Sequence, residues 1–155
     1  MKSIKSSLMV LISASLMIGM GQAADKKIQK SQLPAAVQKT ADEQSKGAIV
    51  IGYATEQEKR QTLYEVQLKV NGHTKDVSMD ANGRVVEVEE EVAIVALPRD
   101  VQEGLKKAAG KGKLGKVESL TKVGKLVAYE AKVTALGKKS EIQVGPKGEK
   151  LDHEE

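Results

Sequence analysis

The sequence contains no cysteine, tryptophan or phenylalanine, and it has only three tyrosines and two histidines among 155 residues. Without cysteine there is no disulfide framework and no thiol nucleophile. The scarcity of aromatic rings removes the side chains that stack on nucleic-acid bases, and acidic residues interrupt most of the lysine runs. Two histidines far apart in sequence are weak evidence for a zinc site, which needs three or four converging ligands. These absences argue against nucleic-acid binding, thiol catalysis and a structural metal.

Catalytic motifs are also missing. The sequence has no Gly-x-Ser-x-Gly elbow, and the glycine- and lysine-rich stretch 110–113 precedes no predicted helix, so it is no phosphate-binding loop. The stretch 80–83, Asp-Ala-Asn-Gly, starts like a calcium loop but lacks the later ligands and the closing glutamate, so it predicts a hairpin turn. We therefore expect a protein that is not an enzyme and needs no cofactor.

The N-terminus has the pattern of a targeting segment. Lys2 and Lys5 precede an apolar stretch from Leu8 to Met20, and small residues end it at Ala23. This stretch is shorter than the roughly 20 residues of a membrane-spanning helix. We expect residues 1–23 to be a signal peptide that meets the membrane only transiently, and the mature chain to be periplasmic or secreted. Removal of the two lysines leaves 23 basic and 21 acidic residues, a net charge of +2.

The remaining chain contains one passage twice. Leu33-Pro34 returns as Leu97-Pro98, an offset of 64, and Tyr64-Glu65 returns as Tyr129-Glu130, an offset of 65. A period of this length is too long for a solenoid repeat and suits a small α+β unit. We predict one unit over residues 24–92 and a second over residues 93–155. Ala24 to Lys30 is expected to be a polar lead-in to the first unit.

In each unit the sequence predicts one helix followed by four strands. Pro34 and Pro98 suit the first turn of a helix, and apolar residues follow each of them at helical spacing. Asn71-Gly72 is typical of a tight hairpin. Gly104 lies inside the second helix, where glycine costs about 1 kcal/mol relative to alanine, and close packing on the sheet would explain it. The predicted strands are 48–54, 62–70, 73–80 and 83–90, then 117–121, 126–135, 138–144 and 149–155.

This order predicts an α+β fold in which two tandem helix-plus-four-strand repeats form one antiparallel sheet with both helices on one face. Tyr64 and Tyr129 fall on apolar strand faces and are expected in the core. The other face would meet water or a partner. It would carry alternating polar residues from the second strand of each unit, among them Glu65, Gln67, Lys69, Glu130 and Lys132.

These motifs together resemble the PepSY-like family. The shared features are Leu-Pro-x-x-Val at the start of a helix, then Tyr-Glu-Val, an Asn-Gly hairpin, Asp-x-x-Gly and a terminal acidic strand, in two copies from Leu33 to Glu155. The resemblance implies an architecture similar to the β-lactamase-inhibitor proteins, whose concave sheet grips another protein. It implies a non-enzymatic binding module that inhibits or regulates an envelope protein or protease. The disulfides and surface aromatics of those inhibitors are absent here.

Two sets of candidate site residues follow. For partner binding we expect Glu65, Gln67, Lys69, Glu130 and Lys132 on the open face, with Tyr53 as the one remaining aromatic anchor. The alternative is a periplasmic cation-binding protein that uses the acidic strand ends Glu89, Glu90, Glu154 and Glu155. Charges on such strands also deter aggregation when the strand lies at a sheet edge, and this interpretation is favoured over a cation site. His73 and His153 are expected to be a hairpin residue and an exposed tail residue.

Overall fold

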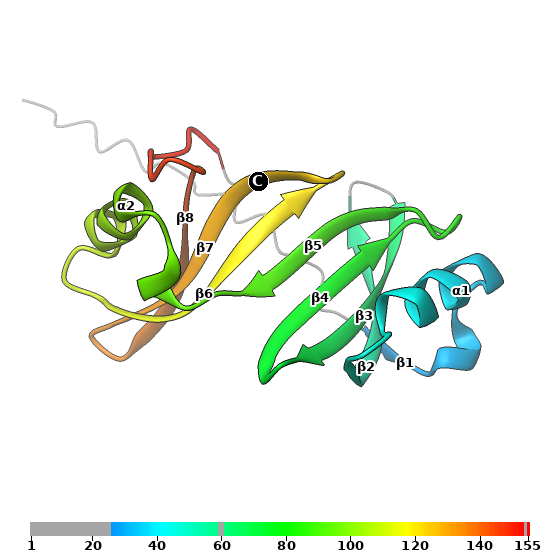
Figure 1. Ribbon diagram of the computed structural model, residues 1–155. Helices are drawn as coiled ribbons and strands as arrows, with labels where there is room; N and C mark the ends of the chain where they lie inside the picture. Colours follow the sequence, from blue (N-terminus) through cyan, green and yellow to red (C-terminus); the bar gives the residue numbers. More distant parts are fainter. Residues whose placement is uncertain (1–25, 59–60, 154) are drawn as a thin grey trace, which may run out of the picture.

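The computed structural model describes residues 26–58, 61–153 and 155, and it is an α+β protein built on one antiparallel sheet (Figure 1). The predicted signal peptide lies outside the described residues. The eight strands follow one another across the sheet in chain order. Their bounds are β1 Lys26–Ile28, β2 Ile49–Glu58, β3 Gln61–Val70, β4 His73–Met79, β5 Val85–Glu91, β6 Lys113–Lys122, β7 Lys125–Ala135 and β8 Lys138–Val144. The helices are α1 Ala35–Gln44 and α2 Arg99–Ala109, each preceded by a short 3₁₀ turn, Lys30–Gln32 and Ile94–Ala96.

The first core cluster lies between α1 and the strands β3 and β4. Pro34, predicted in the first turn, is the N-cap residue directly before α1, and the helix presents Val37 and Ala41 to the sheet because they are one helical turn apart. Tyr64 packs at the margin of this cluster, which confirms its predicted place in the core. The buried members are Leu33, Val37, Ala41, Val66, Leu68, Val77 and Met79.

The second core cluster lies between α2 and the strands β6, β7 and β8. Pro98 caps this helix, and Val101 and Leu105 are fully buried. Tyr129 is 9% exposed, again as predicted. The buried members are Leu97, Val101, Leu105, Val117, Tyr129, Ala131 and Val144. A Cβ on Gly104 would lie 2.1 Å from the Gly148 carbonyl oxygen. Glycine is therefore needed there for α2 to pack closely on the turn that follows β8.

Turn chemistry fixes the hairpins in the first half. Asn71 and Gly72 both have positive φ, 49° and 95°, as a two-residue turn between β3 and β4 requires. In the next turn, Asp80 Oδ1 accepts hydrogen bonds from the N–H groups of Asn82 and Arg84, at 2.9 and 3.0 Å. These bonds, first of all the one from Arg84, hold the pKa of Asp80 below its usual range. The stretch is the predicted hairpin turn.

Three expectations about strands were wrong. The lead-in forms β1, which pairs with β2 from Tyr53 to Thr55. The segment 149–155 forms no strand in its described residues, which make only a single bridge between Lys150 and Val144. At the sequence offset of 65 it has Lys150 and His153 where β5 has Val85 and Val88, so it lacks the apolar side that would hold a strand on the core. The strand predicted over 117–121 starts four residues too late, because β6 already begins at Lys113 in the glycine- and lysine-rich stretch after α2.

The most consequential difference concerns β5. Its carboxylates favoured the interpretation of a protected edge strand, but β5 pairs with β4 on one side and β6 on the other. It is therefore an interior strand, and the side chains of Glu87, Glu89 and Glu91 share one face in the middle of the sheet, whereas Val88 packs against the first core cluster on the other. An edge role cannot explain so many carboxylates there.

Candidate functional site on the open sheet face

The candidate site is the face of the sheet that carries Gln67 of β3, Asp76 of β4 and Glu89 of β5, called here the open face. Because side chains alternate along a strand, the neighbours of core residues point to it. Beside the buried pair Val66 and Val77, the pair Gln67 and Asp76 lies on the open face. The same row continues from Asp76 to Glu89 of β5. The centre of the sheet thus presents polar side chains.

Three carboxylates from three strands meet at this centre. Oxygens of Asp76 in β4, Glu89 in β5 and Glu118 in β6 all lie within 4.8 Å of one another. We call these residues the acidic cluster. The side chain of Glu118 is only 7% exposed, and its Oε1 lies 2.6 Å from Lys116 Nζ. Carboxylates this close together repel one another unless a proton or another cation compensates for their charge.

The surroundings shift the proton affinities in the expected direction. Burial, together with the negative charges of Glu87, Glu118, Glu130 and Asp76, raises the pKa of Glu89 to about 8. Burial also raises the pKa of Glu130, against a hydrogen bond from the Gln143 side chain that lowers it. Glu89 therefore carries a proton at neutral pH in the isolated chain. A cationic group placed against it would replace that proton.

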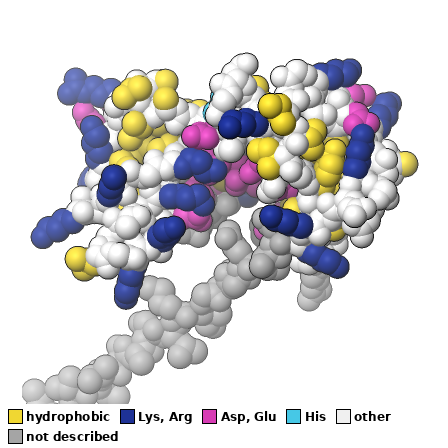
Figure 2. Space-filling view, turned by 90° about the horizontal axis from the view of Figure 1, so that it is seen from below, with side chains coloured by type: hydrophobic (Ala, Val, Ile, Leu, Met, Phe, Trp, Pro, Cys, Tyr) yellow, Lys and Arg dark blue, Asp and Glu magenta, His cyan; other side chains and the backbone are white. Residues whose placement is uncertain are grey.

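Lysines surround the acidic cluster in ion pairs of moderate exposure. Lys122 Nζ lies 3.4 Å from Glu87 Oε2, and Lys132 Nζ lies 2.7 Å from Glu141 Oε1. Figure 2 shows acidic side chains gathered near the middle of one face of the molecule, with lysine and arginine side chains beside them. This surface therefore carries charges of both signs, with carboxylates at its centre. It suits a partner whose charges are opposite at the matching positions.

The predicted contact residues on β3 and β7 lie on this face, on either side of the acidic cluster. On β3, Gln67 Nε2 donates to Glu65 Oε1 at 2.7 Å. On β7, Glu130 Oε2 accepts from Gln143 Nε2 at 3.0 Å. Lys69 and Lys132 share the open face with them by strand alternation. The strands β4, β5 and β6 separate the two groups.

Tyr53 does not join them. It pairs with Val66 across β2 and β3, and strand partners share a face, so its ring points to the core side. There it packs against the first core cluster next to Ile28 of β1. The prediction of an aromatic anchor overlooked β1, which pairs with β2 at Tyr53, and the register of β2 on β3, which leaves this tyrosine partly buried against the first core cluster. The open face therefore has no aromatic side chain among its described residues.

The described glutamates of the alternative cation site, Glu89, Glu90 and Glu155, are not brought together. Glu89 belongs to the acidic cluster, while Glu90 points to the opposite side, where its Oε1 lies 2.9 Å from His73 Nε2. Glu154 lies outside the described residues. Glu155 is near His153, with 3.7 Å between Oε1 and Nε2. His73 opens β4 directly after the hairpin turn, as expected, and the His153 side chain is 79% exposed.

Two members of the acidic cluster were missed by sequence reasoning. Asp76 could have been found, because the Asn71-Gly72 turn fixes the register that sets Asp76 opposite Gln67. Glu118 could not, because the pairing of β5 with β6 follows a long connection through α2 and no turn fixes its register.

None of the described helices is long and apolar enough to cross a membrane.

Comparison with known proteins supports the fold. No family model and no curated protein matches the sequence. Solved structures from Bacteroides species are similar, and three of them follow. A DUF2874 family protein from B. ovatus is 22% identical, with a TM-score of 0.61 over 77% of this chain and 85% of that one. A B. eggerthii protein, provisionally named as periplasmic, is 20% identical, with a TM-score of 0.62 over 76% and 84%.

The third similar structure is a BLIP-like protein from B. fragilis. It is 22% identical to this chain, with a TM-score of 0.55 over 75% of this chain and 81% of that one. At these identities the likeness extends to the fold alone. The chain thus has a fold similar to that of a BLIP-like protein and of DUF2874 family proteins.

Proposed function

We propose that this chain is an exported, non-enzymatic binding module that holds an envelope or secreted protein against its open face. The observation that carries the proposal is the acidic cluster, in which carboxylate oxygens from three strands lie within 4.8 Å of one another. A basic side chain of a partner, inserted between Asp76, Glu89 and Glu118, would neutralise it.

The proposed module consists of two tandem PepSY-like units with both helices on one side of the sheet. Strand register supports this. Val77 of the first core pairs with Val88, and Val88 pairs with Thr121, which alternates in phase with Val117 of the second core. Strand partners share a face, so both cores would lie on one side of the sheet. The second unit then lacks its fourth strand.

Equivalent contacts in the two halves also support the tandem arrangement. The side-chain amide of Gln38 donates to the Leu33 carbonyl at 2.9 Å, and that of Gln102 donates to the Leu97 carbonyl at 3.0 Å. The two pairs share the sequence offset of 64. Export is supported by the N-terminal sequence pattern and by the name of the similar B. eggerthii protein.

Charge reversal on the open face tests the function. The exported form, from Ala24 onward, is immobilised and exposed to cell-envelope extract, and the retained proteins are identified by mass spectrometry. Reversal of Glu65 and Glu130 to lysine is expected to release a specific partner, because both side chains flank the acidic cluster. The matched control reverses Glu43 and Glu103, exposed residues of α1 and α2, and so makes the same change in net charge. Equal retention by both variants would contradict the proposal.

Cation binding is the second candidate function, favoured by the same three carboxylates. Ca²⁺ takes six to eight oxygen ligands, and Lys116 already compensates for one charge at Glu118, so a partner's side chain fits the cluster better. Calorimetry with Ca²⁺ and Zn²⁺ separates the two candidates. Heat that disappears in Glu89→Gln would favour the cation, and an absence of heat at millimolar metal would leave the protein partner.

A further inference from the structure

The turn between β7 and β8 carries a leucine that neither its backbone conformation nor its surroundings favour. Leu136 has a φ of 50°, in the left-handed region that bulky side chains rarely adopt. Its side chain is fully exposed, at 103%. At the sequence offset of 65, the equivalent turn of the first half has Asn71, a residue that suits this conformation. A contact outside the chain would explain why a leucine stands here.

Lysines without acidic neighbours in sequence surround this turn. Residues 104–117 and 131–140 contain eight lysines and no aspartate or glutamate. The pairing of β6 with β7 sets Lys113 opposite Thr134 and brings the two stretches together at one end of the sheet (Figure 1). Two of the lysines form ion pairs, Lys116 with Glu118 and Lys132 with Glu141. Four exposed lysines have no ion-pair partner among the described residues: Lys111, Lys113, Lys138 and Lys139. Leu136 and these four lysines are called here the basic tip.

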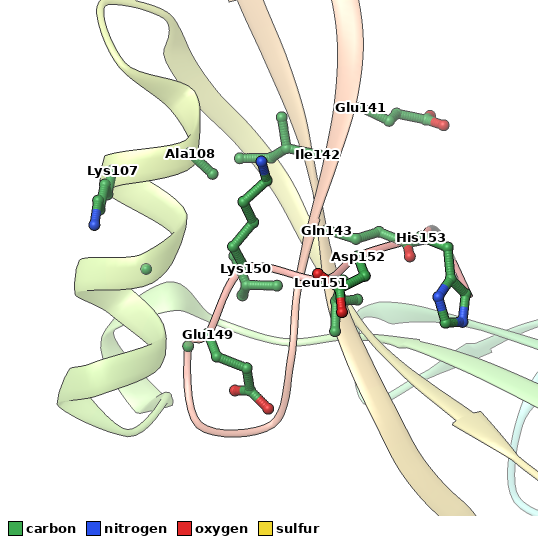
Figure 3. Close-up of a pocket in the computed structure, with 13 residues that line it drawn as sticks. Lys107, Ala108, Glu141, Ile142, Gln143, Glu149, Lys150, Leu151, Asp152 and His153 are labelled. Carbon is green, nitrogen blue, oxygen red and sulfur yellow. The ribbon is translucent and has the colours of Figure 1, made fainter.

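The carboxylates of this half lie toward the other end of β8. The groove of about 640 Å³ between α2, β8 and the C-terminal segment is lined by acidic and basic side chains together (Figure 3). They are Glu141, Glu149 and Asp152 with Lys107 and Lys150. Lys150 also forms a backbone bridge to Val144, so the chain's own C-terminal segment occupies that edge. The excess of positive charge on β8 therefore lies at the end that carries the turn.

A hollow beside the turn offers room for an anionic group. It has a volume of about 490 Å³, and its lining includes Lys132, Thr134, Lys139, Ser140 and Glu141. Because Glu141 is paired with Lys132 at 2.7 Å, the ammonium group of Lys139 and the two hydroxyl groups remain for a ligand. Ammonium and hydroxyl groups donate hydrogen bonds to phosphate oxygens. The hollow thus suits a phosphate group that approaches the basic tip.

The turn between β6 and β7 provides a matched comparison. Val123 has a φ of 49° and is 71% exposed, so it shares the unfavourable features of Leu136. Its N–H donates to the Val86 carbonyl at 2.8 Å, which fastens this turn to the chain beside it. The neighbouring Lys122 is paired with Glu87 at 3.4 Å. An exposed apolar residue is therefore present at both turns, whereas the group of unpaired lysines lies at the β7–β8 turn.

We propose that the basic tip docks on an anionic phospholipid bilayer, with Leu136 inserted among the headgroups and the four lysines against the lipid phosphates. Apolar side chains combined with lysines bind the interface of anionic membranes in this way. A soluble acidic partner would use the lysines but would not need Leu136. The chain would then keep a contact with the membrane beyond the transient one expected of its signal peptide. This contact does not depend on a partner at the acidic cluster, which lies in the middle of the sheet.

Vesicle binding tests the lysines. The chain from Ala24 onward is mixed with vesicles of phosphatidylcholine alone or with an equal part of phosphatidylglycerol, and the bound fraction is measured by flotation. We expect binding to the anionic vesicles only, and weaker binding at higher salt. Lys138→Gln with Lys139→Gln should weaken it about 25-fold, because each lysine near the surface contributes about fivefold. The matched control, Lys39→Gln with Lys125→Gln, changes exposed lysines away from the tip and should alter binding by less than about twofold.

Two substitutions test Leu136 itself. The sequence has no tryptophan, so Leu136→Trp places a single indole at the apex of the turn. Its fluorescence is expected to shift to shorter wavelength on anionic vesicles, whereas Val123→Trp should show no shift. Leu136→Asn introduces the residue of the equivalent first-half turn. This variant is expected to bind at least about fivefold more weakly and to be no less stable than the wild type in urea unfolding.

Circular dichroism of each variant shows whether the fold is kept. Absence of binding to the anionic vesicles overturns the proposal, as does equal binding by the two lysine variants or by Leu136→Asn and the wild type. Equal fluorescence shifts at Leu136 and Val123 also overturn it, and a clear loss of stability in Leu136→Asn would show that leucine is not unfavourable there. Binding of inorganic phosphate or polyglutamate without binding of vesicles would assign the lysines to a soluble anion and likewise overturn it.

Discussion

Replacement of Glu89 by glutamine measures how strongly the acidic cluster opposes folding. The folded chain binds the Glu89 proton more tightly than the unfolded chain, because the surroundings raise its pKa from 4.5 to about 8. Stability from this group is therefore full below pH 4.5 and is lost as the pH rises toward 8. One pKa unit corresponds to 1.36 kcal/mol, so the difference of about 3.5 amounts to about 5 kcal/mol. About half of it falls between pH 5 and pH 7.

Glutamine cannot ionise, so the variant lacks this loss. Urea unfolding followed by circular dichroism at pH 5, 7 and 8.5 gives the free energy of unfolding of both proteins. Relative to the wild type, Glu89→Gln is expected to gain about 2.5 kcal/mol between pH 5 and pH 7. Glu43→Gln, at an exposed position of α1, controls for the chemistry of the substitution. If the curves of the Glu89 variant and the wild type run parallel, burial and the neighbouring carboxylates do not raise the pKa of Glu89 as described.

Three further predictions concern the fold. Gly104→Ala should destabilise the protein by about 1–3 kcal/mol in urea unfolding, although alanine favours a helix, because its Cβ would meet the Gly148 carbonyl; a gain in stability would contradict the close contact. Val77→Ala should cost about 2–3 kcal/mol and the exposed Val123→Ala less than about 0.5, and equal losses would contradict the placement of the core. Asp80 has a lowered pKa, so its contribution is present above its ordinary value of 3.8 and is lost at lower pH; Asp80→Ala should show a flatter acid-unfolding profile, and an unchanged profile would refute this.

Local signals in the sequence predicted those elements that depend on neighbours along the chain. Pro34 and Pro98 marked both helices, and Asn71-Gly72 marked the hairpin between β3 and β4. The open face followed from alternation in β3 and β7. Each of these depends on a few consecutive residues, which is why one sequence was enough.

The errors concern partners distant in sequence. Whether Lys26–Ile28 becomes a strand depends on a free edge of β2, and whether Glu89 lies at an edge depends on β6, which follows after α2. The position of Glu118 beside Glu89 depends on the same pairing. No periodicity within a single segment contains this information. The acidic cluster, the central feature of the site, was therefore predicted only through Glu89.

Because the two halves share β5, they depend on each other when the protein unfolds. On one side β5 completes the sheet over the first core, and on the other its segment Glu87–Glu91 pairs with β6, which belongs to the second core. Neither half can be cut away at a boundary that leaves the other with its full set of hydrogen bonds. Removal of the second half would expose β5 as a new edge, and removal of the first would expose β6. The two cores should therefore unfold in one transition, as a single cooperative unit rather than as two independent domains.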